Sequence, residues 1–331
     1  MSRSIRYLLL PALLLSITAF PASASTSYQL KANTWTLTTV GDIMLDRYVH
    51  SAMLKNGAMF PFAKITNELK GSDVALGNLE GPFTANRSIA TNTKLIFTFD
   101  PKYASTLKQV GFTTLSLANN HTLNFSQAGL QSTRTTLQKS GLDFFGDPQN
   151  KTNYHLTKTL GGRQVTFLGY HGLVGGLDSV LTDIHRAHQK GEYVIIMAHA
   201  GTEYNLKFSS AQQRDYKQLI DAGADMVLGA HPHVVEPIEI YKGKLIAYSL
   251  GNFVFDQYFS ADTQQELMLK MKFTNTAVTV TLVPLMSIRS QVQVATQRMS
   301  ATMLNRLATS SIVPTNIRQN IRDGQFTLST L

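Results

Sequence analysis

Two histidines separated by one proline, His231 and His233, are the side chains of this chain best suited to binding a cation. The apolar run at residues 225–228 precedes them and predicts a short buried strand. Pro232 fixes its own backbone angle and favours extended backbone at His231. Because neutral imidazole is a common metal ligand, this stiffened turn at a strand end favours metal binding. A hairpin that carries surface histidines is the alternative.

Other polar side chains also follow apolar runs that predict strands. They are Asp42, Glu80, Asn120 with its neighbour His121, and His199. Taken singly, each has a structural explanation: a turn former, a solvated acid, a left-handed asparagine, or a buried histidine bonded to backbone. In a chain that alternates strands and helices, the carboxyl ends of the strands meet at one edge of the sheet. The set as a whole therefore predicts a ligand site at that edge.

The donors in this set are carboxylate, amide oxygen and imidazole, without thiolate. Such donors suit a divalent Mn, Fe, Zn or Mg ion rather than a structural zinc. A carboxylate bridging two ions would make a binuclear centre, which activates water and holds both oxygens of an in-line displacement at phosphorus. A histidine beside the asparagine ligand, His121, would then protonate the leaving group.

Alternating strands and helices position these residues and predict an α/β fold. Strands are predicted at residues 35–40, 74–76, 113–117, around 144, at 164–169 and at 193–197. Helices are predicted between 47 and 69, from Asp100 as N-cap to Gly111, from Ser126 as N-cap to Gly141, between 178 and 191, and from a capping box of Ser210 and Gln213 to Gly223. The glycines at the helix ends favour termination there.

The C-terminal part adds strands and a helix. Residues 235–241 and 244–250 predict two strands joined by a tight turn at Lys242-Gly243, and Asn252 follows the second. Beyond Asp256, residues 267–273 and 277–282 predict an antiparallel pair that completes the second sheet, and residues 300–309 predict a helix. Nothing in this last part suggests chemistry, and its methionines are assigned to packing.

The first 24 residues have the pattern of a signal peptide. Arg3 and Arg6 precede an apolar run at residues 7–20, and Ala22-Ser23-Ala24 forms an A-x-A cleavage site. Cleavage after Ala24 would give a periplasmic or extracellular protein; a retained N-terminal anchor is the alternative. The remaining residues, 25–331, are expected to form a single domain, with a core at about 36–256 and C-terminal strands and a helix at 262–331.

The composition is that of a globular protein with anionic partners. The 331 residues are 43% hydrophobic and 15% charged, include no cysteine, and carry a formal net charge of +9. The positive charge favours an anionic polymer, phospholipid headgroups or a phosphorylated envelope substrate. No basic stripe interleaved with aromatic residues is present, so nucleic acid is not expected as a partner.

Six short motifs carry a resemblance to a known family. They are Gly41-Asp42-Ile43-Met44-Leu45, Asn78-Leu79-Glu80, Ala118-Asn119-Asn120-His121, the segment from His199 to Tyr204, Gly229 to Val234, and Tyr248 to Phe253. Their order and spacing resemble the CapA family of capsule-synthesis proteins, linked in some members to poly-γ-glutamate. That family is similar to calcineurin-like metallophosphoesterases, which implies a four-layer α/β/β/α sandwich.

The resemblance also implies roles. Asp42 and His233 would hold a first metal, Glu80 would bridge, and Asn120, His199 and His231 would hold a second. His121 would be the acid or would polarise the phosphoryl oxygen. Substrate-binding or positioning roles are implied for Arg47, Asn78, Asn119, Glu203 and Asn252. Membrane proteins of capsule synthesis are implied as partners.

Two positions depart from the pattern. Met44 stands where phosphoesterases have the histidine of D-x-H, and a thioether is a poor ligand for these cations. Asn124 stands where the family has an aspartate after Asn120-His121. The function expected first is a metal-dependent, phosphoesterase-like hydrolase of an anionic capsule or envelope component. A non-catalytic binding or export factor for such a polymer, and hydrolysis of γ-glutamyl amide bonds at the same centre, are the alternatives.

Overall fold

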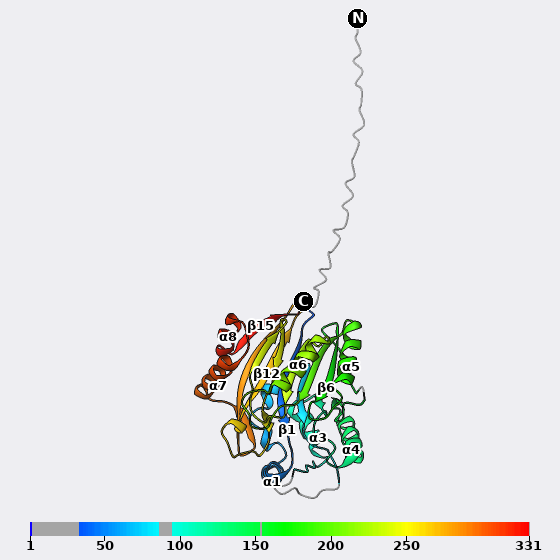
Figure 1. The fold of residues 1–331 in the computed structure, drawn as a ribbon, viewed down its shortest axis with the longest axis vertical. Coiled ribbons are helices and arrows are strands. Elements are labelled where there is room, and N and C mark those ends of the chain that lie inside the picture. The colour runs from blue at the N-terminus through cyan, green and yellow to red at the C-terminus, as the bar shows by residue number, and fades with distance from the viewer. Residues whose placement is uncertain (2–32, 86–94, 153, 331) are drawn as a thin grey trace. The chain divides into compact units, whose positions relative to one another are not determined.

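Two β-sheets stacked face to face form the centre of the fold (Figure 1). The computed structural model describes residue 1 and residues 33–85, 95–152 and 154–330. The residues from Ala32 onward form one compact unit. Apart from Met1, the predicted signal peptide lies outside the described residues. Within the described ranges, no helix is both long and apolar enough to cross a bilayer.

The first sheet contains nine strands among the described residues. Its parallel part is β1 (Trp35–Ile43), β2 (Val74–Leu79), β3 (Thr114–Ser116) and β4 (Asp143–Phe145), with the short β11 (Asn252–Val254) beside β1. On the other side of β1 the sheet continues antiparallel through β12 (Gln265–Phe273), β13 (Ala277–Ile288) and β14 (Gln291–Val294), while β15 (Gln325–Ser329) also pairs with β13.

The predicted antiparallel pair therefore exists, but it extends the first sheet rather than the second. β12 pairs directly with β1, with Trp35 opposite Phe273 and the two rings stacked at 3.8 Å between centroids. This contact buries the aromatic faces that the start of β1 would otherwise expose. The polarity of the two segments predicted their pairing with each other, and it carried no information about which sheet they join.

The second sheet contains six strands in the order β5-β6-β7-β8-β10-β9. Their bounds are β5 Leu156–Leu160, β6 Arg163–His171, β7 Tyr193–His199, β8 Met226–Ala230, β9 Ile238–Tyr241 and β10 Lys244–Ala247. The four central strands are parallel, and both edge strands are antiparallel to their neighbours.

Helices cover the outer face of each sheet. α1 (Arg47–Asn56), η1 (Phe60–Phe62), α2 (Thr66–Leu69), α3 (Tyr103–Val110) and α4 (Ser126–Lys139) pack on the first sheet through an outer apolar cluster that includes Val40, Ala75, Leu107 and Leu137. α5 (Leu177–Gln189) and α6 (Ser210–Asp221) pack on the second. The α/β class and the four-layer α/β/β/α arrangement are thus confirmed.

The C-terminal helices lie beside the second sheet. α7 (Gln297–Ser310) and α8 (Thr315–Arg322) contribute Leu304 and Ile321 to the same core as β13 and β15, and Ile312 pairs with Glu239 of β9. The short η2 (Asp262–Gln264) precedes β12. α7 and α8 therefore cover inner surface of the first sheet that the second sheet leaves open.

Helix starts differ from prediction by small amounts. The capping box is formed by Ser209 and Gln212, one residue earlier than predicted. α3 begins at Tyr103 rather than Pro101, and Ser126 is the first residue of α4 rather than its cap. Such shifts of one or two residues are common, because the terminal turns of helices fray and are often irregular.

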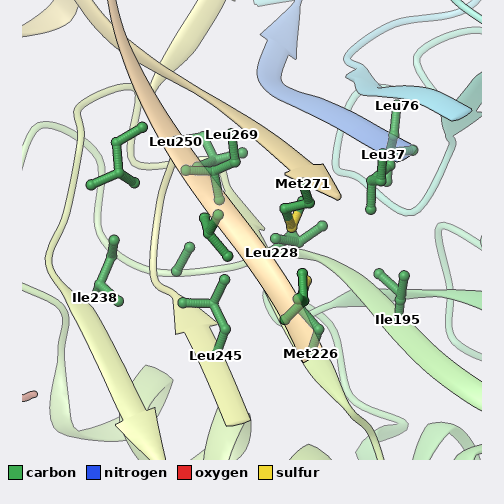
Figure 2. Packing of buried hydrophobic residues seen from close by; sticks show 14 of the residues in the cluster. Leu37, Leu76, Ile195, Met226, Leu228, Ile238, Leu245, Leu250, Leu269 and Met271 are labelled. Carbon is green, nitrogen blue, oxygen red and sulfur yellow. The ribbon is translucent and has the colours of Figure 1, made fainter. Parts of the chain in front are cut away.

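Apolar side chains from both sheets interlock in the space between them. Figure 2 shows Leu37 and Leu76 of the first sheet beside β12 residues Leu269 and Met271, with Met226 of the second sheet nearby. Each such side chain contributes about 1.5–3 kcal/mol through burial. This packing fixes the two sheets against each other, so the carboxyl ends of β1 and β8 meet.

Two glycines allow the closest approach at that edge. A Cβ added to Gly41 would lie 1.8 Å from the carbonyl oxygen of Gly251, and one added to Gly229 would lie 1.8 Å from that of Tyr248. Both β1 and β8 therefore press against the segment from Tyr248 to Gly251, which any side chain at either glycine would displace.

Candidate metal centre

Asp42 joins the two sheets at their carboxyl edges. It lies near the end of β1 and is fully buried. Its Oδ1 accepts a hydrogen bond from Asn78 Nδ2 at 2.8 Å, and its Oδ2 accepts the backbone N–H of His231 at 3.1 Å. The Nδ1 of His233 lies 3.4 Å from Oδ2. The carboxylate is thus fixed in position by both halves of the fold.

Asn78 and Asn119 hold the surrounding loops. Asn119 Nδ2 donates to Asn78 Oδ1 at 3.0 Å and to the Leu79 carbonyl at 2.8 Å. Its Oδ1 accepts from the backbone N–H groups of His121 and Thr122. These contacts make both asparagines positioning residues.

Asn120 and His199 lie side by side. Asn120 Oδ1 is 2.9 Å from His199 Nε2, while the other ring nitrogen of His199 is 3.1 Å from Asn78 Nδ2. The rings of His199 and His231 are 4.7 Å apart. Burial and the neighbouring imidazoles lower the pKa of His199 well below its usual value, so the ring is neutral and suited to metal binding.

The turn that carries His231 and His233 follows β8, as predicted, but its backbone is not extended. The φ angles of the two histidines are 98° and 60°, so the expectation for His231 was wrong. The hydrogen bond from its N–H to Asp42 imposes the tighter turn, and the tertiary contact outweighs the preference before proline. Burial lowers the pKa of His231 to about 4, and its Nδ1 is buried without a hydrogen-bond partner among the described residues.

Asn252 orients His233. Its Oδ1 lies 2.9 Å from His233 Nδ1, while its Nδ2 donates to Gln257 Oε1 and to the Thr263 carbonyl. With Nδ1 held on this side, His233 Nε2 lies 3.9 Å from Glu80 Oε1. Asn252 therefore acts on the site through His233.

Glu80 has the most unusual surroundings. It follows β2 and is fully buried, and neither carboxylate oxygen has a hydrogen-bond partner in the described part of the chain. Burial, followed by repulsion from Asp42, raises its pKa well above the usual value. The nearest cationic candidate, His121 Nε2, is 3.7 Å away and neutral. A buried carboxylate of this kind needs a cation to be ionised.

The donor atoms converge in two overlapping groups. Asp42, Glu80 and His233 offer ligand atoms within 4.8 Å of one another, and so do Glu203, His231 and His233. Glu203, which is exposed, therefore stands with the donors rather than only in the substrate-binding or positioning role that the resemblance implied. We call Asp42, Glu80, Asn120, His199, Glu203, His231 and His233 the donor set.

Met44 faces away from the donor set. Its side chain is fully buried in the outer apolar cluster, and its sulfur accepts the backbone N–H of Asp46 at 3.0 Å. The position that is histidine in phosphoesterases is therefore used for packing here.

His121 is oriented by Asn124. Its Nδ1 lies 3.1 Å from Asn124 Oδ1, which also accepts the backbone N–H of Phe97 at 2.7 Å. Because this oxygen is an acceptor, Nδ1 of His121 carries the ring proton and Nε2 is unprotonated. The ring also packs on Phe97, with centroids 4.1 Å apart. Burial lowers the pKa of His121 to about 4.

A cavity of about 420 Å³ leads to the donor set. Arg47 lies in its wall, where it pairs with Asp256 and packs over Phe97 and Phe255. The partners of Arg47 were not predictable from the sequence, because they come from distant segments without a strand-end pattern. The remaining lining residues are Tyr48, Leu95, Asn120, His121, Glu203, Tyr204, His233, Gln257, Tyr258 and Phe259.

His171 is a further imidazole beside the donor set. It ends β6 in register with His199, and the two rings are 5.8 Å apart. Its Nδ1 lies 2.7 Å from the Pro148 carbonyl, and Nε2 is buried without a hydrogen-bond partner among the described residues. The strand-end rule that selected His199 would also have selected His171.

Comparisons with known proteins agree with the motifs. The family described as bacterial capsule synthesis protein PGA_cap matches residues 36–257. The PGA biosynthesis protein CapA of Bacillus subtilis (strain 168) is 34% identical over 237 residues, which cover 66% of this chain and 62% of that protein. The capsule biosynthesis protein CapA of Bacillus anthracis is 31% identical over 280 residues, which cover 76% of this chain and 67% of that protein.

This chain thus spans less than two thirds of the Bacillus subtilis protein. Among solved structures, that of TT1561 of Thermus thermophilus aligns with a TM-score of 0.41 and 10% identity, over 73% of this chain and 99% of that one. On the family match over residues 36–257 and the Bacillus relatives, the chain belongs to the family of bacterial capsule synthesis proteins.

Proposed function

We propose that this protein is a metal-dependent hydrolase of the phosphoesterase type that acts on an anionic capsule or cell-envelope component. The observation that carries the proposal is Glu80, a fully buried carboxylate without a hydrogen-bond partner among the described residues, placed between Asp42 and neutral imidazoles. Such an arrangement is unfavourable for the protein alone and favourable around a divalent cation.

The donor chemistry fits one or two divalent ions. Asp42, Glu80 and His233 would hold one ion, and Glu203 and His231 would hold a second together with His233. Asn120 and His199 lie beside the second group and would complete it. Oxygen and imidazole donors without thiolate suit Mn, Fe, Zn or Mg. When bound, such ions act as Lewis acids that polarise a phosphoryl oxygen and activate water.

The chain's own residues would orient the substrate and exchange a proton with it. His121, fixed through Nδ1 by Asn124, presents Nε2 on the side of Glu80, where it meets the leaving oxygen. Arg47, held by Asp256, lines the cavity and would meet an anionic group that enters it. With its ring proton on Nδ1, His121 would accept a proton at Nε2 and return it to the leaving oxygen, which is general acid–base catalysis beside a metal site.

The place of action and the partners are part of the same proposal. The N-terminal sequence pattern supports export, cleavage after Ala24 and a periplasmic or extracellular location. The net charge of +9 supports an anionic polymer or a phosphorylated envelope substrate. The capsule-related names of the Bacillus relatives support a role in capsule synthesis, and contact with membrane proteins of that process belongs to the same proposal.

A second function is favoured by Met44. Because its thioether packs in the outer apolar cluster, one ligand of the usual phosphoesterase site is missing. A protein with a weakened metal site would bind and guide an anionic polymer without hydrolysing it.

The test is metal content measured beside turnover. Elemental analysis of the purified protein is expected to find one or two equivalents of a divalent metal, and loss of both metal and phosphodiester hydrolysis in His231→Ala/His233→Ala. His121→Ala should keep the metal and lose hydrolysis. Polymer binding without metal or turnover would support the guiding function instead. Release of glutamate from a γ-linked oligomer by the metal-loaded protein would favour amide hydrolysis at the same centre.

A further inference from the structure

Exposed aromatic side chains surround the mouth of the cavity that leads to the donor set. Tyr48, Tyr204, Tyr258 and Phe259 line this cavity, and their exposed fractions are 50%, 46%, 36% and 66%. They come from three separate segments: α1, the loop after β7, and the loop after β11. We call these four residues the aromatic collar.

The collar reaches from solvent to the donor set. The rings of Tyr48 and Tyr258 are 6.2 Å apart with an angle of 30° between their planes. On the other side, Phe259 meets Tyr204 edge to face at 5.1 Å, and Tyr204 lies nearly parallel to the ring of His233 at 6.0 Å. A flat molecule that contacts the collar therefore lies next to a donor-set residue.

The protein holds these exposed rings in place. Tyr204 has a φ of 63°, unusual for a bulky residue, and its N–H donates to the Pro232 carbonyl at 2.8 Å. Its hydroxyl accepts a hydrogen bond from Gln257 Nε2 at 3.2 Å, and the Tyr258 hydroxyl pairs with Ser290 Oγ. Fixed exposed aromatic rings around a site are unfavourable for folding and indicate ligand binding.

The charge of the cavity limits what can bind there. Among the described residues that line it, Arg47 is the one permanent cation, and it is already paired with Asp256. Glu203 also lies in the wall, and Asp42 and Glu80 lie behind it. Two divalent ions would offset these carboxylates and leave capacity for about one further anionic group. A polymer with a carboxylate on every unit would meet uncompensated negative charge at the collar.

We propose that the collar is a subsite for an uncharged sugar ring, and that the substrate is a sugar phosphoester whose phosphoryl group lies at the donor set. The aromatic faces of the collar would stack on the C–H face of such a ring. This assignment rests on the proposed phosphoesterase function, since it places the phosphoryl group at the metal centre.

The test compares two ligands that share the phosphate and differ in the ring. Binding of glucose 1-phosphate and of glycerol 3-phosphate to the Mn²⁺-loaded protein is measured by titration calorimetry. The sugar phosphate is expected to bind about tenfold more tightly, the increment that one good ring contact supplies. Tyr258→Ala/Phe259→Ala should abolish this preference, leaving glycerol 3-phosphate affinity and metal content unchanged, and Phe259→Tyr should retain it. Ile312→Ala, which removes an exposed apolar side chain beside β9, is the matched control and should change neither affinity.

Several outcomes would overturn the assignment. Equal affinities in the unmodified protein, or a preference that survives the double substitution, would remove the sugar subsite. Tighter binding of p-nitrophenyl phosphate would point to an aryl group, and tighter binding of a γ-linked glutamate oligomer to the polyanion. Equal rates of hydrolysis of glucose 1-phosphate and glycerol 3-phosphate would contradict the sugar subsite but would still support the proposed phosphoesterase function. Preferential binding without hydrolysis would retain the subsite and remove the catalytic function.

Discussion

Glu80 and Glu266 are both fully buried glutamates whose carboxylate oxygens have no hydrogen-bond partner among the described residues. Burial raises the pKa of both well above the usual value. Their surroundings differ. Glu80 lies within 4.8 Å of other metal-ligating groups and near a cavity, whereas Glu266 shares its face of β12 with Met268 in the outer apolar cluster. An isolated buried carboxylate thus indicates a site only where other donors converge on it.

The strongest test of this comparison is metal binding. Glu80→Gln keeps the size of the side chain and removes its charge, and we expect it to weaken metal affinity by more than about 100-fold. Glu266→Gln is the matched control and should bind metal like the unmodified protein. The measurement is calorimetric titration with Mn²⁺ or Zn²⁺. Equal losses in both variants would mean that the effect is structural.

The two carboxylates should also differ in their effect on the free energy of unfolding, and here the change is expected at Glu266. Glu266→Leu replaces an unpaired buried carboxyl by an apolar side chain, and we expect the free energy of unfolding to rise by about 1–3 kcal/mol. Denaturant titration measures this change. A lower free energy of unfolding would show that the Glu266 carboxyl has a stabilising partner, which would weaken the contrast with Glu80.

A third buried glutamate, Glu236, extends the comparison to the pH dependence of stability. Burial raises the pKa of Glu236 to about 8 from 4.5, although Gln212 Nε2 donates to its Oε2 at 2.8 Å. The folded protein therefore retains a proton that the unfolded chain releases, so this stabilising contribution is complete below pH 4.5 and is lost as the pH rises through about 8. Glu236→Gln should remove about 3 kcal/mol of this pH dependence between pH 5 and 8. The free energy of unfolding of both proteins is measured between pH 5 and 8. If the two values change in parallel with pH, Glu236 is not the source of the pH dependence.

The smallest expected effect concerns the residue that orients His121. Asn124→Ala removes the acceptor for Nδ1 and should lower kcat about tenfold without changing metal content. Asn124→Asp keeps an acceptor for Nδ1, so kcat should stay near that of the unmodified protein. The acidic limb of its pH profile should shift to higher pH, because a carboxylate raises the pKa of the His121 imidazole. A variant with unchanged kcat would place His121 outside the proton transfer.

Several parts of the site were predictable because they obey a local rule. Asp42, Glu80, Asn120, His199 and His231 each lie at or just past the carboxyl end of an apolar strand, and parallel strands bring such positions together. The same rule applies to His171, which was overlooked. The four-layer arrangement came from the resemblance carried by the motifs, not from periodicity.

Other parts of the site could not be predicted from local sequence patterns. Asp256 pairs with Arg47 across more than 200 positions of sequence, and the aromatic collar is assembled from three loops. The packing of Met44 in the outer apolar cluster depends on how the chain turns after β1 against the helices. Neither polarity nor spacing encodes which distant loops meet, since that is decided by how the two sheets stack.

The position of β1 has a consequence for how the chain folds. β1 lies early in the sequence, yet it pairs with β11 and β12, more than 200 residues later, and Asp42 donates its backbone N–H to the Gly251 carbonyl at 3.1 Å. One side of β1 therefore stays unpaired until the chain beyond β12 has been synthesised. Contacts of such long sequence separation slow folding, so we expect the donor set, which depends on them, to form slowly.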